Sequence, residues 1–338
     1  MAATNRAIAD ASMRPLFVLS LWRSGSSLLH ALLNQHPQIA LLYEGELPQL
    51  QPLLRGHFHD GSWRQKWEFW NQALSRHGIP LESLPSRVGD AWQATSAAYR
   101  EFARRKNATV WGEKSPHWYD NALRTAAKFP DARFIFLWRD VNAIMESIER
   151  AARFERFFRK PGFLTRVLVG TEKLRQACGA LRARGHSVHE VHYEELIANT
   201  EGCMRQICGF LELGFEPEMT TLEKADRSAT FSGRHHELVR SDQVVSVTGR
   251  ASSLSPPTRT KLARYVWRWK KGSGSEWPKL PSTLPPATRP PDLLELALDR
   301  ALYRTLVSWD LMVKVIYSIA PIALANAFRR WVREHWRA

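Results

Sequence analysis

The stretch from Leu16 to Leu33, LFVLSLWRSGSSLLHALL, decides the fold. It begins with an apolar run of strand length, continues with a short polar turn, and ends with apolar residues at helical spacing. A strand, a tight turn and a helix in this order direct backbone N–H groups and the positive end of the helix dipole at one point. The stretch therefore predicts an anion site at the start of the helix.

The turn contains charged, small and hydroxyl-bearing residues: Arg23, Ser24, Gly25, Ser26 and Ser27. Gly25 lets the backbone approach an anion closely, the serines add hydroxyl donors, and Arg23 adds a charged donor. A Walker A loop needs a lysine directly before its final Ser or Thr, and Ser26 stands at that place. We therefore expect a site for a single phosphate group rather than for a triphosphate with its metal ion.

The chain has 338 residues, enough for one large α/β domain with additions or for two domains. Its formal net charge of +15 indicates an anionic ligand, an acidic membrane surface or nucleic acid as partner, unless the excess serves only solubility. The three cysteines offer no disulfide framework, and neither a signal peptide nor a zinc-binding cluster is apparent. We expect a cytoplasmic protein without a metal ion.

Strand patterns alternate with helix patterns through most of the chain. The predicted strands cover 16–21, 39–42, 109–112, 134–138 and 188–192, and the predicted helices between and after them cover 26–35, 118–129, 141–153, 163–185 and 200–211. Such alternation is typical of a parallel sheet with helices on both faces. The expected fold class is α/β, with a P-loop-like central parallel sheet flanked by helices.

We divide the chain into a flexible tail (1–14), an α/β domain (15–271), a proline-rich linker (272–291) and a helical C-terminal extension (292–338). The α/β domain contains a helical insertion at 47–106. Three tryptophans at helical spacing in this insertion are interpreted as core, with a wall of the acceptor pocket as the alternative: Trp63, Trp67 and Trp70.

The longest uncharged run of the C-terminal extension, 315–328, is interrupted by Pro321 and falls short of the ~20 residues that span a bilayer. Arginines and tryptophans follow it, a combination that suits the surface of a membrane. The C-terminal helices are therefore candidates for peripheral membrane contact. The alternative is a pair of helices packed on the domain.

Polar residues follow several predicted strands. Glu44 and Glu46 come after the second strand, Lys114 after the third and Arg139 after the fourth. Because ligands bind at the carboxyl ends of parallel strands, we expect these side chains beside the turn. Ser147 lies two helical turns beyond Arg139, so that this pair and the helix N-terminus form a second anion site. Two phosphate sites suggest a nucleotide that is phosphorylated at two separate places.

With these motifs the sequence resembles the sulfotransferases that use 3′-phosphoadenosine 5′-phosphosulfate (PAPS), particularly bacterial and tyrosylprotein-type members. Residues 23–28 resemble the family's 5′-phosphosulfate loop, and Arg139 with Ser147 resembles its 3′-phosphate motif. Residues 111–116 resemble the segment that carries a lysine at the end of a strand, and residues 191–196 resemble a further landmark of the family.

The resemblance implies that the donor is bound by Arg23, Ser24, Gly25, Ser26, Ser27, Arg139, Ser147, Tyr193 and Arg250. In this assignment the amides of 24–27 hold the 5′-phosphate, and Arg139 and Ser147 bind the 3′-phosphate. Arg23 and Lys114 face the sulfuryl group and the bridging oxygen. No metal ion is implied.

The resemblance covers about residues 15–212 and implies a glutamate as the general base. Glu44, 21 residues after Arg23, stands at the matching position. Glu46 is a rival, because residues two apart on an extended segment point the same way. The two alternatives stay open at this stage.

The expected reaction is metal-free, in-line transfer of the sulfuryl group from PAPS to a hydroxyl group of a small-molecule or lipid-like acceptor. The acceptor and the oligomeric state cannot be read from the sequence. One alternative is a nucleotide-dependent kinase, although the turn lacks the lysine and no acidic metal site is apparent. The other is a non-enzymatic basic protein bound to a membrane or to nucleic acid. Nucleic acid is not expected as a partner, because basic residues are spread along the chain and no recognition motif is present.

Overall fold

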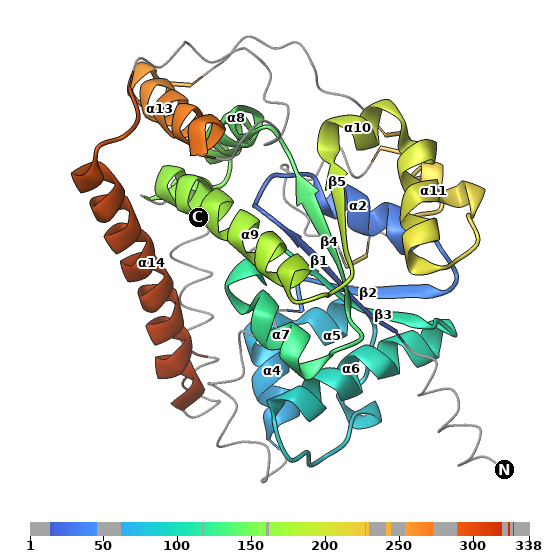
Figure 1. Ribbon diagram of the computed structural model, residues 1–338. Helices are drawn as coiled ribbons and strands as arrows, with labels where there is room; N and C mark the ends of the chain where they lie inside the picture. The colour runs from blue at the N-terminus through green and yellow to red at the C-terminus, as the bar shows by residue number, and fades with distance from the viewer. Residues whose placement is uncertain are drawn as a thin grey trace, which may run out of the picture.

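The computed structural model describes residues 14–45, 62–116, 118–159, 162–226, 228–229, 241–244, 254–272, 289–319, 324 and 327. Within this part of the chain, five strands form one sheet in the order β2-β3-β1-β4-β5, and all neighbouring strands are parallel (Figure 1). The strands are β1 (Arg14–Ser20), β2 (Ile39–Tyr43), β3 (Val110–Ser115), β4 (Arg133–Trp138) and β5 (Val188–His192). The predicted α/β class with a central parallel sheet is confirmed, and the carboxyl ends of all five strands share one edge.

Successive residues of the central strand β1 enter two different cores. Phe17 and Leu19 belong to one core, and Leu16 and Val18 belong to the other. The helices over the first core include α6 (Ala91–Lys106), α7 (Ala122–Lys128), α8 (Val141–Ala152) and α9 (Phe163–Ala183). Those over the second are α2 (Ser26–Leu33), α10 (Tyr193–Ala198) and α11 (Thr200–Leu211). Both faces of the sheet are therefore covered, as a parallel sheet requires.

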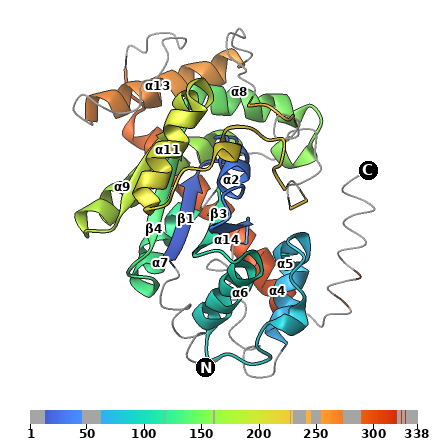
Figure 2. The same ribbon diagram turned by 90° about the vertical axis from the view of Figure 1, so that its right-hand side faces the viewer.

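Further helices extend the first core. They are α4 (Trp63–Asn71), α5 (Ala73–Arg76), α13 (Pro256–Gly272) and α14 (Leu293–Ile319), with the short 3₁₀ turns η1 (Leu81–Ser83), η2 (Trp118–Asn121), η3 (Arg156–Arg159) and η4 (Pro217–Thr220) elsewhere. Helices α4, α5 and α6 form one group (Figure 2), and α6 packs on β2 and β3. Trp63 and Trp67 are fully buried and stack at 6.1 Å, which confirms their interpretation as core. The side chain of Trp70 lies outside the described part.

Three predicted boundaries are wrong. Strand β1 begins at Arg14, which donates its N–H to the carbonyl of Thr109 at 2.8 Å and so does not belong to a flexible tail. Strand β3 continues to Ser115, because the pairing with β1 extends beyond the apolar run, and Lys114 therefore lies inside the strand. The segment 118–129, predicted as one helix, begins as the 3₁₀ turn η2 before α7.

Gly112 marks a close approach of two strands. Its φ is +150°, and a Cβ atom there would lie 1.9 Å from the carbonyl oxygen of Leu16 in β1. Only glycine lets β3 pair with β1 at this point, two residues before Lys114.

Most of the proposed linker and the ends of the chain, 1–13 and nearly all of 320–338, lie outside the described residues. Among the described helices, none combines the length and the apolar character needed to cross a bilayer.

Helix α14 packs on α9, on the side that faces away from the sheet (Figure 1). Its buried residue Asp299 joins three helices: the carboxylate accepts hydrogen bonds from Thr165 at 3.1 Å and from Tyr265 at 2.7 Å, and Lys261 Nζ lies 2.7 Å away. Buried carboxylates of this kind are stabilising only while all their partners remain.

We predict that Asp299→Ala lowers the free energy of unfolding by about 2–4 kcal/mol, because two buried hydroxyl groups and an ammonium group lose their acceptor. Chemical denaturation followed by circular dichroism measures this loss. Glu201→Ala is the control, because Glu201 forms an exposed ion pair with Arg205 and its removal should change stability by less than about 1 kcal/mol. Equal losses in the two variants would show that Asp299 does not join the helices.

Candidate active site

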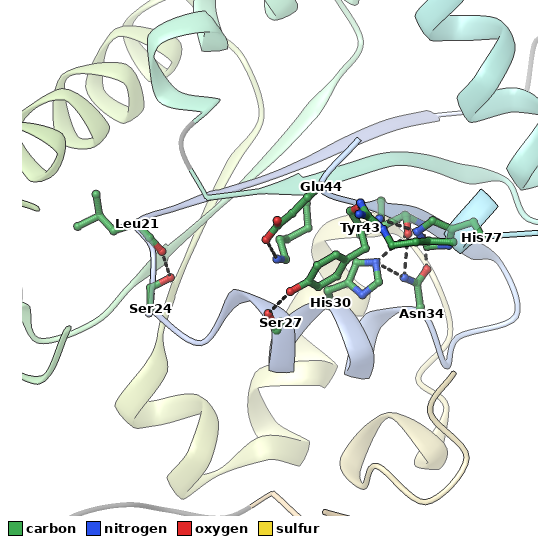
Figure 3. Close-up of polar contacts among 11 residues, drawn as sticks. Leu21, Ser24, Ser27, His30, Asn34, Tyr43, Glu44 and His77 are labelled. Carbon is green, nitrogen blue, oxygen red and sulfur yellow. Dashed lines mark hydrogen bonds and ion pairs between the residues drawn. The ribbon is translucent and has the colours of Figure 1, made fainter. Parts of the chain in front are cut away.

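The turn between β1 and α2 is tightly folded. Arg23 has a φ of 64° and Gly25 has a φ of 93°, both in the left-handed region. Ser24 Oγ donates a hydrogen bond of 2.7 Å to the carbonyl of Leu21 and closes the turn (Figure 3). No side chain caps the N-terminus of α2, and the N–H groups of a first helical turn have no intrahelical acceptors. The turn thus presents amide donors that suit an anion.

Tyr193, the first residue of α10, covers this turn. A Cβ atom built on Gly25 would lie 2.3 Å from Cδ2 of the Tyr193 ring, so ring and glycine are in direct contact. The other partner of the ring is Arg139, whose guanidinium lies 4.3 Å from the ring centroid. Tyr193 therefore joins the turn after β1 to the residue that follows β4.

Arg139 and Arg23 lie side by side. Arg139 Nη1 donates a hydrogen bond of 2.7 Å to the carbonyl of Arg23, and Arg23 Nε donates one of 3.0 Å to Ser147 Oγ. The resemblance implied that Arg23 faces the sulfuryl group, and this role stays a prediction beside the observed hydrogen bond from Arg23 to Ser147. The turn, Arg139 and Ser147 thus belong to one site, as predicted from their positions at the sheet edge.

The electrostatics of this cluster favour an anion. Burial, followed by the neighbouring charge of Arg139, lowers the pKa of Arg23 to about 10, and burial also lowers the pKa of Arg139. Arg139 Nε is buried and has no hydrogen-bond partner among the described residues. A bound anion would satisfy this donor and relieve the repulsion between the guanidinium groups.

Arg150 is a residue of this cluster that the sequence analysis missed. It lies one helical turn after Ser147 on α8, and its charge contributes to the lowered pKa of both Arg23 and Arg139. The spacing of three residues on a helix, which places two side chains on the same face, is the signal that could have found it.

Lys114 and Glu44 form the second half of the site. Lys114 is fully buried, and its Nζ lies 2.9 Å from Oε1 of Glu44 and 3.7 Å from the ring centroid of Tyr43. Burial alone would lower the pKa of Lys114, but the attraction of Glu44 and then of Tyr43 outweighs it and raises the pKa overall. Lys114 therefore keeps its positive charge inside the protein.

Glu44 follows β2 directly. Its N–H donates to the carbonyl of Lys114 at 2.8 Å, and its φ of 52° is unusual for a residue with a side chain. The Glu44 side chain is 18% exposed, and its carboxylate points to the Lys114 ammonium group beside Tyr43 (Figure 3). Glu46 and Arg250 lie outside the described residues, and their predicted roles stay predictions.

Tyr43, also missed by the sequence analysis, connects the two halves. Its hydroxyl group is 2.7 Å from Ser27 Oγ in the turn, and its ring contacts Lys114 (Figure 3). Burial raises the pKa of Tyr43, which therefore stays neutral. Tyr43 also interacts electrostatically with Arg23, so the two halves of the site are close to one another. Its position at the end of a strand, directly before Glu44, is the signal that could have drawn attention to it.

Two buried histidines support this strand end. Tyr43 donates its N–H to Nε2 of His77 at 2.8 Å, and Nε2 of His30 lies 2.8 Å from the carbonyl of Leu41 (Figure 3). Burial and then the charge of Arg76 lower the pKa of His77 to about 3, and burial holds the pKa of His30 well below its ordinary value. Both imidazoles are neutral, and His77 can act as the acceptor for Tyr43.

The structure brings most of the predicted site residues to one edge of the sheet: Arg23, Ser24, Gly25, Ser26, Ser27, Glu44, Lys114, Arg139, Ser147 and Tyr193. Within the described ranges, no group of three or more His, Cys, Asp or Glu side chains is arranged to hold a metal ion. The arrangement combines amide donors, guanidinium groups, a buried ammonium group and one carboxylate.

Comparison with known proteins identifies relatives of the chain. The model of the sulfotransferase family matches residues 15–217. Protein-tyrosine sulfotransferase A of Caenorhabditis elegans is 22% identical over 258 residues, which cover 74% of this chain and 60% of the relative. A protein-tyrosine sulfotransferase of Drosophila melanogaster is 25% identical over 232 residues, covering 63% of this chain and 43% of the relative. The match thus spans less than two thirds of the length of these two relatives.

The fold has a counterpart among solved structures. The sulfotransferase domain from the curacin biosynthetic pathway superimposes with a TM-score of 0.53 at 19% sequence identity, over 76% of this chain and 98% of that domain. At this identity the likeness concerns the fold.

We predict that Gly25→Ala weakens binding of adenosine 3′,5′-bisphosphate by ~10-fold or more. A residue with a side chain is strained by about 1–2 kcal/mol in the left-handed conformation. A tenfold loss of affinity corresponds to about 1.4 kcal/mol, which lies within this range. The added methyl group would also displace Tyr193. Calorimetry measures the affinity. The control is Gly185→Ala, which has a φ of +78° and no atom within 4 Å of the added Cβ, so that it imposes a similar strain without the clash. Undiminished affinity in Gly25→Ala would contradict this description of the turn.

Proposed function

The chain belongs to the sulfotransferase family, and from this premise we propose that it transfers a sulfuryl group from PAPS to a hydroxyl group, with Glu44 as the general base. The observation that carries the proposal is the hydrogen-bonded cluster of Arg23, Arg139 and Ser147 directly beside the turn of α2. It provides two anion sites at one edge of the sheet, which match a nucleotide with phosphate groups at both its 3′ and 5′ positions.

The residues present fit the donor. The buried Arg139 Nε lacks an acceptor among the described residues, and Arg23, Ser147 and Arg150 would supply further donors and charge for the 3′-phosphate. The amides of the α2 turn would hold the 5′-phosphate, with Gly25 allowing close approach. Tyr193 would connect the two anion sites, because its ring contacts Gly25 in the turn and the guanidinium of Arg139.

In the proposed reaction, the acceptor oxygen forms a bond to sulfur while the bond from sulfur to the bridging phosphate oxygen breaks. The proton of the acceptor hydroxyl passes to the Glu44 carboxylate, and the electron pair of the broken bond stays on the leaving phosphate. Lys114 and the turn amides would stabilise the charge that grows on the leaving oxygen.

The contact between Lys114 and Glu44 suggests the order in which these two side chains act. With no donor bound, the ammonium group lies 2.9 Å from Oε1 of the carboxylate and occupies that oxygen. In the proposed complex Lys114 turns to the bridging oxygen, and Glu44 is then free to accept a proton. Tyr43 would keep the ammonium group in place during the exchange, because its ring contacts Nζ and its hydroxyl is fixed by Ser27.

The acceptor is proposed only as a class. The names of the two relatives point to protein tyrosine as one hydroxyl group to test, and a small-molecule or lipid-like alcohol is the other. The family assignment leaves no support for the kinase alternative.

The test uses the full chain with PAPS labelled in its sulfate and with tyrosine peptides or a metabolite extract as acceptors. We expect labelled product and tight binding of adenosine 3′,5′-bisphosphate in the presence of a metal chelator. Absence of nucleotide binding would contradict the proposal.

We predict that Glu44→Gln lowers turnover by ~10²–10⁴-fold, the usual contribution of a general base, while the affinity for adenosine 3′,5′-bisphosphate is retained. Steady-state kinetics across a range of pH would show loss of the acidic limb of the profile. Glu46→Gln is the matched control and should keep its activity. If Glu46→Gln loses turnover and Glu44→Gln does not, Glu46 is the base.

A further inference from the structure

Helix α14 carries an exposed stripe of large apolar side chains: Leu294, Leu298, Leu302, Trp309 and Met312. Their separations of four, four, seven and three residues place them on one side of the helix. Leu298 and Trp309 are each 60% exposed. A continuous apolar stripe of this length marks an interaction surface rather than ordinary scattered exposure.

The opposite side of α14 is fixed to the domain. Leu296 and Tyr303 are buried, and Asp299 is held by its contacts with α9 and α13. The hydroxyl of Tyr303 donates to Asp120 at 2.8 Å. Because these contacts set the rotation of the helix, α14 cannot bury the stripe by turning about its own axis.

Between Leu293 and Trp309, the acidic and basic side chains of α14 lie on different sides of the helix. Of its three acidic residues, Glu295 and Asp299 face the domain and are ion-paired, Glu295 with Arg264 at 2.9 Å, and the side chain of Asp310 lies outside the described part. Arg300 and Arg304, one turn apart, are exposed. From Leu293 to Trp309, the solvent-facing surface of the helix therefore carries positive charge only.

A cavity of about 320 Å³ lies where Arg300 and Arg304 meet α9. Its wall includes three cationic side chains, those of Arg300, Arg304 and Lys173, and one carboxylate, that of Glu172. Arg304 makes no ion pair with another described residue, the contact from Arg300 to Glu172 is long, at 3.6 Å, and Lys173 is ion-paired with Asp120. The cavity is therefore suited to a negatively charged group such as a lipid phosphate.

We propose that α14 lies on the surface of an anionic membrane, with the stripe at the boundary between headgroups and acyl chains and with lipid phosphates at Arg300 and Arg304. An amphipathic helix with leucine and tryptophan on one side and arginine on another binds such a boundary. The formal net charge of +15 adds long-range attraction to an anionic surface. The same charge disfavours a second copy of the chain as the occupant, because association would bring like charges together.

The test compares flotation of the full chain with phosphatidylcholine vesicles that contain phosphatidylserine and with vesicles of phosphatidylcholine alone. We expect binding to the anionic vesicles that weakens with salt. The double variant Leu298→Ser, Trp309→Ser should bind them ~10-fold or more weakly, because two large apolar side chains no longer enter the bilayer. Arg300→Gln with Arg304→Gln should weaken the preference for phosphatidylserine, and an unchanged preference would contradict a phosphate site at these two arginines.

Phe154→Ser is the matched control, because Phe154 is also 60% exposed but lies outside α14, and it should leave binding unchanged. Both apolar changes are at exposed positions, so denaturation midpoints should stay close to that of the parent chain. Equal flotation of parent and double variant would overturn the proposal. So would a dimer in light scattering that the double variant abolishes while vesicles are not bound, since the stripe would then be occupied by a second copy.

Discussion

The hydrogen bond from Arg139 to the carbonyl of Arg23 joins the end of β4 to the turn after β1, and the active site is built around it. It holds the turn in a shape that has two left-handed residues, and it places two guanidinium groups together in a buried setting. Burying like charges is unfavourable unless an anion compensates them. The fold therefore keeps buried positive charge together at one edge of the sheet, an arrangement that a bound anion would compensate.

Much of this arrangement could be predicted from local pattern. The apolar runs located the five strands, and parallel pairing meant that residues after them would meet at one edge, so Lys114, Arg139 and the turn could be grouped in advance. The position of Ser147 two helical turns after Arg139 added that residue, and the resemblance to sulfotransferases added Tyr193, which a pattern of strands and helices would not have selected. The family model matches almost the same residues that carried the resemblance.

What could not be predicted depends on contacts between distant segments. No local pattern indicates that Arg23 donates a hydrogen bond to Ser147, or that Gly25 lies against the ring of Tyr193. Lys114 was placed after its strand because polar residues usually end an apolar run, but pairing with β1 continues past it. The role of Tyr43 was hidden for a similar reason, since an aromatic residue at the end of a buried strand has the same pattern whether it packs in the core or supports a lysine.

The neutral imidazole behind β2 has a consequence for behaviour in acid. An unfolded chain takes up a proton on a histidine below about pH 6.5, whereas the folded chain, with the pKa of His77 at about 3, does not. Folding stability is therefore fully present above pH 6.5 and declines by about 1.4 kcal/mol per pH unit for one such group as the pH falls toward 3. His30 acts in the same direction. Because His77 accepts the Tyr43 amide next to Glu44, protonation of His77 would remove the hydrogen bond that supports this end of β2.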